Sequence, residues 1–94
     1  QVAVHTRLAG ARAANNELDI RGMMTDEADL AVDRFLDSAL MGKLNTVTII
    51  HGKGTGALRK AVHQQLRRHT AVKSFRLGRY GEGEDGVTVV ELKQ

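Results

Sequence analysis

The feature that most constrains the fold of this chain is the segment 51–56, with the sequence HGKGTG, called the glycine loop below. It follows the apolar run 46–50 and precedes a stretch, 57–69, whose apolar residues recur at helical spacing. Glycines between a strand and a helix allow left-handed backbone and expose N–H groups at the helix N-terminus, which favours phosphate. The predicted phosphate-binding residues of the loop are Gly52, Lys53, Gly54, Thr55 and Gly56.

The spacing excludes two nucleotide-binding patterns. The Walker loop needs four residues between its first glycine and a Gly-Lys-Ser/Thr, and the glycine loop lacks them. The dinucleotide fingerprint needs an acidic residue about 20 positions after its glycines, whereas the chain has no Asp or Glu between Ser38 and Gly81. We therefore expect no nucleotide in this domain. A tight connection without any ligand remains the alternative.

Charge is distributed unevenly along the 94 residues. Residues 38–81 include nine basic and no acidic side chains, whereas residues 17–37 include seven acidic and two basic ones. Such asymmetry indicates a polyanionic partner, with an ordinary solvated surface as the alternative. The basic residues predicted to contact a nucleic acid outside the glycine loop are Arg59, Lys60, Arg67 and Arg76.

Several classes of protein are excluded by composition. There are no cysteines, which rules out disulfides and thiolate metal sites. No apolar run approaches the ~20 residues of a membrane span, and the N-terminus lacks a signal-peptide core. We expect a soluble, intracellular domain with no membrane partner. The chain begins with Gln1 rather than Met, which suggests a piece of something longer.

Hydrophobic periodicity predicts a two-layer α/β domain over residues 17–94, with 1–16 as an arm or linker end. The expected strands span 17–22, 46–51, 72–79 and 87–92, and the expected helices span 26–41 and 57–69. Right-handed crossovers make the first three strands parallel, and the final hairpin makes the fourth antiparallel. The order β-α-β-α-β-β then gives a four-stranded mixed sheet of order 1-2-4-3, with both helices on one face.

Local signals refine this prediction. Thr25 is the expected N-cap of the first helix, and Gly42 is its expected stop. On the second helix we expect His63 to face water, beside the basic side chains. Four aspartates of the first helix form a stripe that we interpret as a solvated face: Asp26, Asp29, Asp33 and Asp37. Weak alternation near the N-terminus, in residues 2–6, suggests a short edge strand.

The first two strands end on the same side of the sheet, so Asp19 and Arg21 should converge with the glycine loop. The loop and Lys53 would hold a phosphate, Arg21 would offer bidentate contact, and His51 could move a proton. The predicted catalytic residues are thus Asp19, Arg21 and His51. Asp19 could also hold a weakly bound Mg²⁺ or Mn²⁺ ion. The alternative for Asp19 and Arg21 is a salt bridge that orients the strand end.

Three ordered motifs carry a resemblance to a known family: LDIRG at 18–22, HGKGTG at 51–56 with Leu58-Arg59 behind it, and GVTVVEL at 86–92. Together they resemble the Smr (small MutS-related) domain over about 17–94, in particular the C-terminal Smr domain of the second bacterial branch of MutS homologues. The resemblance implies a fold like the C-terminal domain of a translation initiation factor. It also implies nicking of DNA, especially branched recombination intermediates, with suppression of homologous recombination and a parent MutS-like ATPase.

One position departs from the family pattern. Stand-alone nuclease branches commonly have Asp-x-His in the first motif, whereas position 21 is Arg here. Arginine stays protonated and cannot serve as a general base, so proton transfer falls to His51 or Asp19. Two functions remain open: a nicking endonuclease acting on branched or duplex DNA, or a module that only binds DNA, structured RNA or ribosomal RNA. The second includes a role at collided ribosomes, where members of the wider family act.

Overall fold

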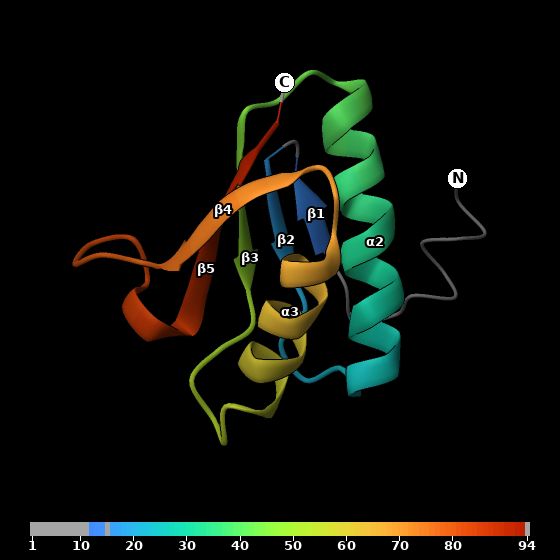
Figure 1. Ribbon diagram of the computed structural model, residues 1–94. Helices are drawn as coiled ribbons and strands as arrows, with labels where there is room; N and C mark the ends of the chain where they lie inside the picture. Colours follow the sequence, from blue (N-terminus) through green and yellow to red (C-terminus); the bar gives the residue numbers. More distant parts are fainter. Residues whose placement is uncertain (1–11, 15, 94) are drawn as a thin grey trace.

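The structure, a computed structural model, describes residues 12–14 and 16–93. Two helices cover one face of a twisted five-stranded sheet (Figure 1). The elements are β1 (Arg12–Ala14), β2 (Glu17–Asp19), α2 (Thr25–Met41), β3 (Thr46–Ile50), α3 (Ala57–Arg68), β4 (Val72–Leu77), the 3-10 turn η1 (Glu84–Gly86) and β5 (Val87–Leu92).

The sheet order is β1-β2-β3-β5-β4. Strands β2 and β3 are parallel, and β5 is antiparallel to both β3 and β4. The four predicted strands therefore occur in the predicted order, and the two-layer architecture is confirmed. Strand β1 pairs antiparallel with β2 and adds a fifth strand within the segment that we assigned to an arm. The edge strand suggested for residues 2–6 lies outside the described residues.

The core lies between the sheet and the helices. Alternate residues of the strands face the helices, as the two-residue period of a strand requires. The fully buried side chains that fill this layer include Ile20, Val32, Leu36, Val47, Ile49, Val62, Leu66 and Val90. Each such side chain stabilises the fold by roughly 1.5–3 kcal/mol relative to its exposed state, and the layer fixes where the strand ends meet the helix termini.

The ends of α2 differ in detail from the prediction. The helix begins at Thr25 and is capped by Met24, whose N–H donates to Glu27 Oε1 at 3.1 Å, so the assignment of Thr25 as N-cap is wrong by one residue. The Glu27 side chain reaches back and accepts the N–H of the cap residue itself, as the third helical residue does in a capping box. At the other end Gly42 is the C-cap as predicted, but the left-handed residue is Lys43, with φ of 58°.

In the part of the chain that the structure describes, neither helix combines the length and the apolar character needed to cross a membrane.

Candidate functional site

The carboxyl ends of β2 and β3 lie side by side, as predicted. Asp19 is in register with Ile50, and the Ile20 N–H donates to the Ile50 carbonyl at 2.9 Å. Asp19 and Arg21 form a bidentate pair, with Arg21 Nη2 and Nε at 2.6 and 3.0 Å from the carboxylate oxygens. The Arg21 N–H also donates to Asp19 Oδ1 at 3.1 Å. The salt bridge that we kept as the alternative is thus present, and it directs the guanidinium.

Two arginine side chains flank the glycine loop. A Cβ on Gly52 would lie 3.3 Å from Arg21 Cγ, and a Cβ on Gly56 would lie 2.8 Å from Arg59 Nη2. Both glycines have positive φ, 81° and 86°. Glycine is needed at these positions because it takes this backbone conformation and leaves room for the arginines. The fold therefore brings the aliphatic part of Arg21, which follows β2, to one end of the loop and the guanidinium of Arg59, from α3, to the other.

The protein itself occupies part of the predicted anion nest. The N–H groups of His51 and Gly52 both donate to the Gly86 carbonyl, at 3.1 and 2.9 Å. Among the described residues, no acceptor is bonded to the N–H groups of Lys53 and Gly54. The first turn of α3 carries no acidic side chain, so its N-terminus remains favourable for an anion.

Acidic side chains form ion pairs with two of the residues predicted to bind phosphate, Lys53 and Arg76. They come from residues 82–85, called the acidic segment below. Lys53 Nζ lies 3.5 Å from Asp85 and 3.9 Å from Glu84, and Arg76 Nη1 lies 2.8 Å from Glu82. The side-chain bond from Arg76 and the backbone bond from Arg79 lower the pKa of Glu82 to about 2. The run without acids between residues 38 and 81 is therefore partly neutralised by the segment that follows it.

We predicted that Asp19, Arg21 and His51 converge in one cluster, and for His51 this prediction is wrong. Its ring is only 4% exposed, and both ring nitrogens are hydrogen-bonded, Nδ1 to the Gly52 carbonyl at 2.9 Å and Nε2 to Thr88 Oγ1 at 2.8 Å. His51 follows Val47 and Ile49 on the helix-facing side of β3, whereas Asp19 alternates with the core residue Leu18 and points the other way. The imidazole and the carboxylate are thus on opposite faces of the sheet.

The expectation that His63 faces water is wrong. His63 is half-buried on α3, its Nε2 lies 2.7 Å from Thr88 Oγ1, and its ring packs against Phe75 with centroids 4.8 Å apart. Burial lowers the pKa of His63, and the neighbouring groups His51, Arg67 and Arg59 lower it further. Helical periodicity marked this position as outer, but strand β4 at the sheet edge extends over it.

Burial also lowers the pKa of His51, with the charge of Arg59 in the same direction and the Gly52 carbonyl and Asp85 opposing it. In both histidines the lowered pKa favours the neutral form of the ring. The sequence reasoning missed Thr88, which is fully buried between them. The sequence contained a signal for this role. Thr88 lies two and four residues before Val90 and Leu92, so its hydroxyl is on the same, core-facing side of β5 and requires a polar partner.

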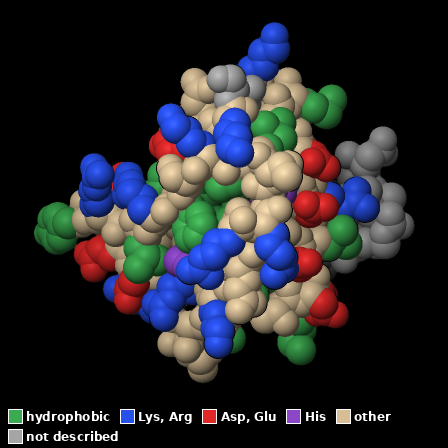
Figure 2. Space-filling model, in the orientation of Figure 1, with side chains coloured by type: hydrophobic (Ala, Val, Ile, Leu, Met, Phe, Trp, Pro, Cys, Tyr) green, Lys and Arg blue, Asp and Glu red, His purple; other side chains and the backbone are tan. Residues whose placement is uncertain are grey.

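Basic side chains are spread over the face formed by α3, β4 and the adjoining loops (Figure 2). The described basic residues that are exposed or half-exposed on these elements are Lys53, Arg59, Lys60, Arg67, Arg68, Lys73, Arg76 and Arg79. Arg67 also lies over the ring of Phe75, with its guanidinium carbon 5.8 Å from the ring centroid. The predicted contacts Arg59, Lys60, Arg67 and Arg76 thus belong to one charged surface that includes the glycine loop.

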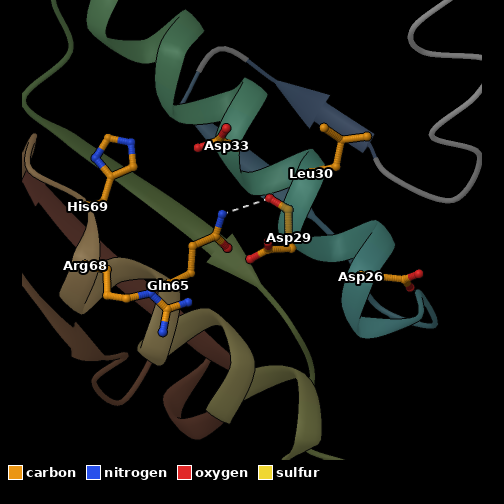
Figure 3. A pocket seen from close by; sticks show the side chains of 7 residues that line it. All are labelled: Asp26, Asp29, Leu30, Asp33, Gln65, Arg68 and His69. Carbon is orange, nitrogen blue, oxygen red and sulfur yellow. Dashed lines mark hydrogen bonds between the residues drawn. The ribbon is translucent and has the colours of Figure 1, made fainter.

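A shallow groove separates α2 and α3 (Figure 3). Three aspartates of the predicted solvated stripe line one wall, and Gln65, Arg68 and His69 line the other. The Gln65 side chain donates to the Asp29 carbonyl at 2.8 Å and ties the two helices together. Charges of both signs face each other here, and the glycine loop lies at the opposite end of α3.

The residues do not fit a tightly held metal ion. Both oxygens of Asp19 already accept hydrogen bonds from Arg21. The described residues contain no cluster of three or more histidine, cysteine or carboxylate side chains that could surround a cation. A divalent ion generally needs several oxygen ligands, so we derive no chemical step through one.

The family model of the Smr domain matches residues 18–93. The protein named Endonuclease MutS2 of Clostridium botulinum (strain Eklund 17B / Type B) is 59% identical over 78 residues, which are 83% of this chain and 10% of that protein. The Endonuclease MutS2 of Caldicellulosiruptor bescii is 54% identical over 93 residues, 99% of this chain and 12% of that protein. The chain therefore spans about a tenth of the length of these curated relatives.

Solved structures agree with this match. The crystal structure of the Smr domain of Thermus thermophilus MutS2 superimposes with a TM-score of 0.83 at 48% identity, covering 84% of this chain and 99% of that one. The crystal structure of YdaL, a stand-alone small MutS-related protein from Escherichia coli, gives a TM-score of 0.82 at 25% identity, covering 100% of this chain and 77% of that one.

Proposed function

Because this chain belongs to the Smr domain family, a nuclease-type domain found in MutS2, we propose that its glycine loop binds the sugar-phosphate backbone of a nucleic acid and that the domain cleaves a phosphodiester bond there. One observation carries the proposal. Arg21 and Arg59 lie against the two ends of the loop, at Gly52 and Gly56. Guanidinium groups match the geometry of phosphate oxygens, and the loop adds N–H donors between them.

Each residue then has a distinct role. Arg21, Arg59 and Lys53 stabilise the charge that develops on the phosphate oxygens, and Asp19 holds the Arg21 guanidinium in place. The bond to Asp19 also raises the pKa of Arg21, so Arg21 acts only as a cation. We assign proton transfer to His51, which can change charge near neutral pH. Since its ring is buried under the loop, the phosphate binds first, with the bond between Nδ1 and the Gly52 carbonyl intact, and this bond opens only afterwards, when His51 transfers a proton.

The proposed substrate is branched or duplex DNA, cut by the domain as part of a longer MutS-like ATPase in the bacterial cytoplasm, with suppression of homologous recombination as the outcome. Specificity would come from backbone and shape contacts rather than base stacking, because Tyr80 is the only fully exposed aromatic side chain among the described residues.

A second function has an observation of its own in its favour. His51 is buried with both nitrogens bonded, and Asp19 is committed to Arg21, so the groups that could move a proton hold the protein together instead. In that case the domain binds DNA, structured RNA or ribosomal RNA without cutting it, and a partner such as the parent ATPase or a collided ribosome defines its role.

The two functions are separated by assaying the chain on supercoiled plasmid, a four-way DNA junction and a structured RNA, each with Mg²⁺, Mn²⁺ or EDTA. We expect nicking by the wild type and loss of nicking with retained binding in Asp19→Asn. His51→Ala should lose nicking and also bind more weakly, because His51 holds the Gly52 carbonyl. Asp33→Asn is the matched control, since it makes the same chemical change on α2. Binding without nicking by the wild type would establish the second function. Equal cutting by all four proteins would refute the residue assignment.

A further inference from the structure

Thr88 lies in the middle of a hydrogen-bond chain that joins α3 to the glycine loop. Its side chain is fully buried on β5. Oγ1 lies 2.8 Å from His51 Nε2 and 2.7 Å from His63 Nε2. At the end of the chain, His51 Nδ1 lies 2.9 Å from the Gly52 carbonyl oxygen. Three hydrogen bonds thus connect helix α3, strand β5 and the first two residues of the glycine loop.

Chemistry fixes the direction of each bond. A carbonyl oxygen can only accept, so His51 Nδ1 carries a proton and donates to Gly52. In the neutral ring Nε2 then lacks a proton, and the Thr88 hydroxyl must donate to it. The hydroxyl has one proton, so Oγ1 accepts from the protonated Nε2 of His63. The two histidines are therefore in opposite tautomers, with the proton on Nδ1 in His51 and on Nε2 in His63.

Burial, together with the surrounding charges, favours the neutral form of both rings. Arg59 and Asp85 act on His51, whereas Arg59 and Arg67 act on His63, so cations outnumber acids around the pair. The ring centroids lie 6.1 Å apart. Protonating both rings would direct two N–H groups at one buried oxygen and leave the Thr88 hydroxyl proton without an acceptor, which is costly in the interior. A single arrangement of the chain therefore holds at neutral pH.

The hydrogen-bond chain acts on the backbone of Gly52, the first glycine of the loop. The Gly52 N–H donates to the Gly86 carbonyl at 2.9 Å, and the Gly52 carbonyl accepts from His51. The carbonyl oxygen is thus turned toward a buried ring. An oxygen turned outward would repel a phosphate, whereas the inward orientation lets the loop present the N–H groups of Lys53 and Gly54.

We propose that Thr88 and His63 are positioning residues of the phosphate-binding loop, which act through His51 to hold the Gly52 carbonyl away from the ligand. That the loop binds a phosphate rests on the proposed function, whereas the hydrogen bonds from His63 to Gly52 do not depend on it. His63 is in turn held by the ring of Phe75, so the conformation of the loop depends on side chains from β4, β5 and α3.

The first test is nitrogen NMR of the chain labelled at histidine, near neutral pH and without nucleic acid. We expect opposite tautomers for His51 and His63. Thr88→Val removes the hydroxyl at nearly constant shape and should turn His63 into a tautomer mixture, whereas Thr88→Ser should keep the wild-type pattern. The proposed directions of the hydrogen bonds would be refuted if both wild-type rings had the same tautomer. They would also be refuted if the tautomer of His63 did not change in Thr88→Val.

The second test measures amide exchange at Gly52. Loss of a buried hydrogen bond predicts exchange at Gly52 about tenfold faster in Thr88→Val and His63→Leu, with the amide of Val32 in α2 as the internal reference. His63→Gln keeps a side-chain N–H donor and should restore slow exchange. Equal acceleration at Gly52 and Val32 would mean a general loss of stability and would refute a positioning role.

The third test links the chain to binding. The affinity for a DNA duplex should fall in His63→Leu and recover in His63→Gln, without a change in the number of phosphate contacts. An affinity equal to that of the wild type in His63→Leu would refute the positioning role. The first two tests use no nucleic acid, so they can succeed even if the domain does not bind DNA. Conversely, the domain can bind DNA even if the tautomer and exchange results contradict the positioning role.

Discussion

Replacing Glu82 by glutamine tests whether the acidic segment competes with nucleic acid for the basic surface. In the structure Glu82 holds Arg76 through two hydrogen bonds of 2.8 and 3.2 Å and accepts the Arg79 N–H at 2.7 Å. The pKa of Glu82 is lowered to about 2, so this carboxylate stays charged at any pH suitable for a binding assay. Glutamine keeps the shape and an acceptor oxygen but removes the charge, which frees Arg76 for a phosphate.

The size of the effect follows from counterion release. Each additional contact between a basic side chain and B-DNA steepens the plot of log affinity against log salt by about 0.9. Between about 50 and 200 mM salt, one extra contact therefore changes the affinity about 3.5-fold. We expect Glu82→Gln to bind duplex DNA more tightly than the wild type at the low end of this range and to lose most of that advantage at the high end.

Fluorescence anisotropy of a labelled duplex, titrated across this salt range, measures the slope. Asp37→Asn on α2 removes one acidic charge far from Arg76 along the chain and controls for net charge. The double variant Glu82→Gln with Arg76→Gln should return to the wild-type slope. The reasoning fails if Glu82→Gln leaves the slope unchanged, or if Asp37→Asn steepens it by the same amount.

Two further predictions concern the loop and pH. Gly56→Ala and Gly22→Ala both force alanine into positive φ, 86° and 83°, at about 1–2 kcal/mol each, but only the first displaces Arg59. DNA affinity should therefore fall in Gly56→Ala alone, and equal losses would exclude a role for Arg59. The pKa values of His51 and His63 are lower in the folded than in the unfolded protein, so on acidification the unfolded protein binds protons at higher pH. Acidification below pH ~6.5 should therefore reduce the free energy of unfolding. Urea unfolding should show at most ~1.4 kcal/mol per pH unit for each histidine, less for the partly exposed His63, and a gain would contradict the argument.

Sequence patterns were sufficient for the sheet because they depend on local chemistry. The apolar runs at 46–50 and 87–92 are buried in adjacent central strands, and the more polar run at 72–77 lies at the edge. The hydrophobic period of two leaves one arrangement that buries these runs beneath both helices. Strand β1 was missed because three residues carry too little pattern, and its pairing depends on the exposed edge of β2.

The candidate site was harder to predict because it depends on which face of the sheet each side chain occupies. Asp19 and His51 lie at the ends of neighbouring strands, yet they have opposite parity relative to the core residues Leu18 and Ile49. The pattern of apolar residues contains this information, and applying it to the polar residues would have separated them. The partners of His63 could not be predicted in this way, since Phe75 and Thr88 come from two strands, β4 and β5, which meet α3 only through packing.

The segment from Glu84 to Thr88 explains why the second and third sequence motifs belong together. Asp85 pairs with Lys53, the Gly86 carbonyl accepts the N–H groups of His51 and Gly52, and the Thr88 hydroxyl bonds the His51 ring. Charge, carbonyl and hydroxyl from one short stretch thus act on consecutive residues of the glycine loop. The loop is therefore not an independent anion nest, because its conformation depends on the register between β3 and β5. A substitution that shifts this register should weaken phosphate binding even when every basic residue is retained.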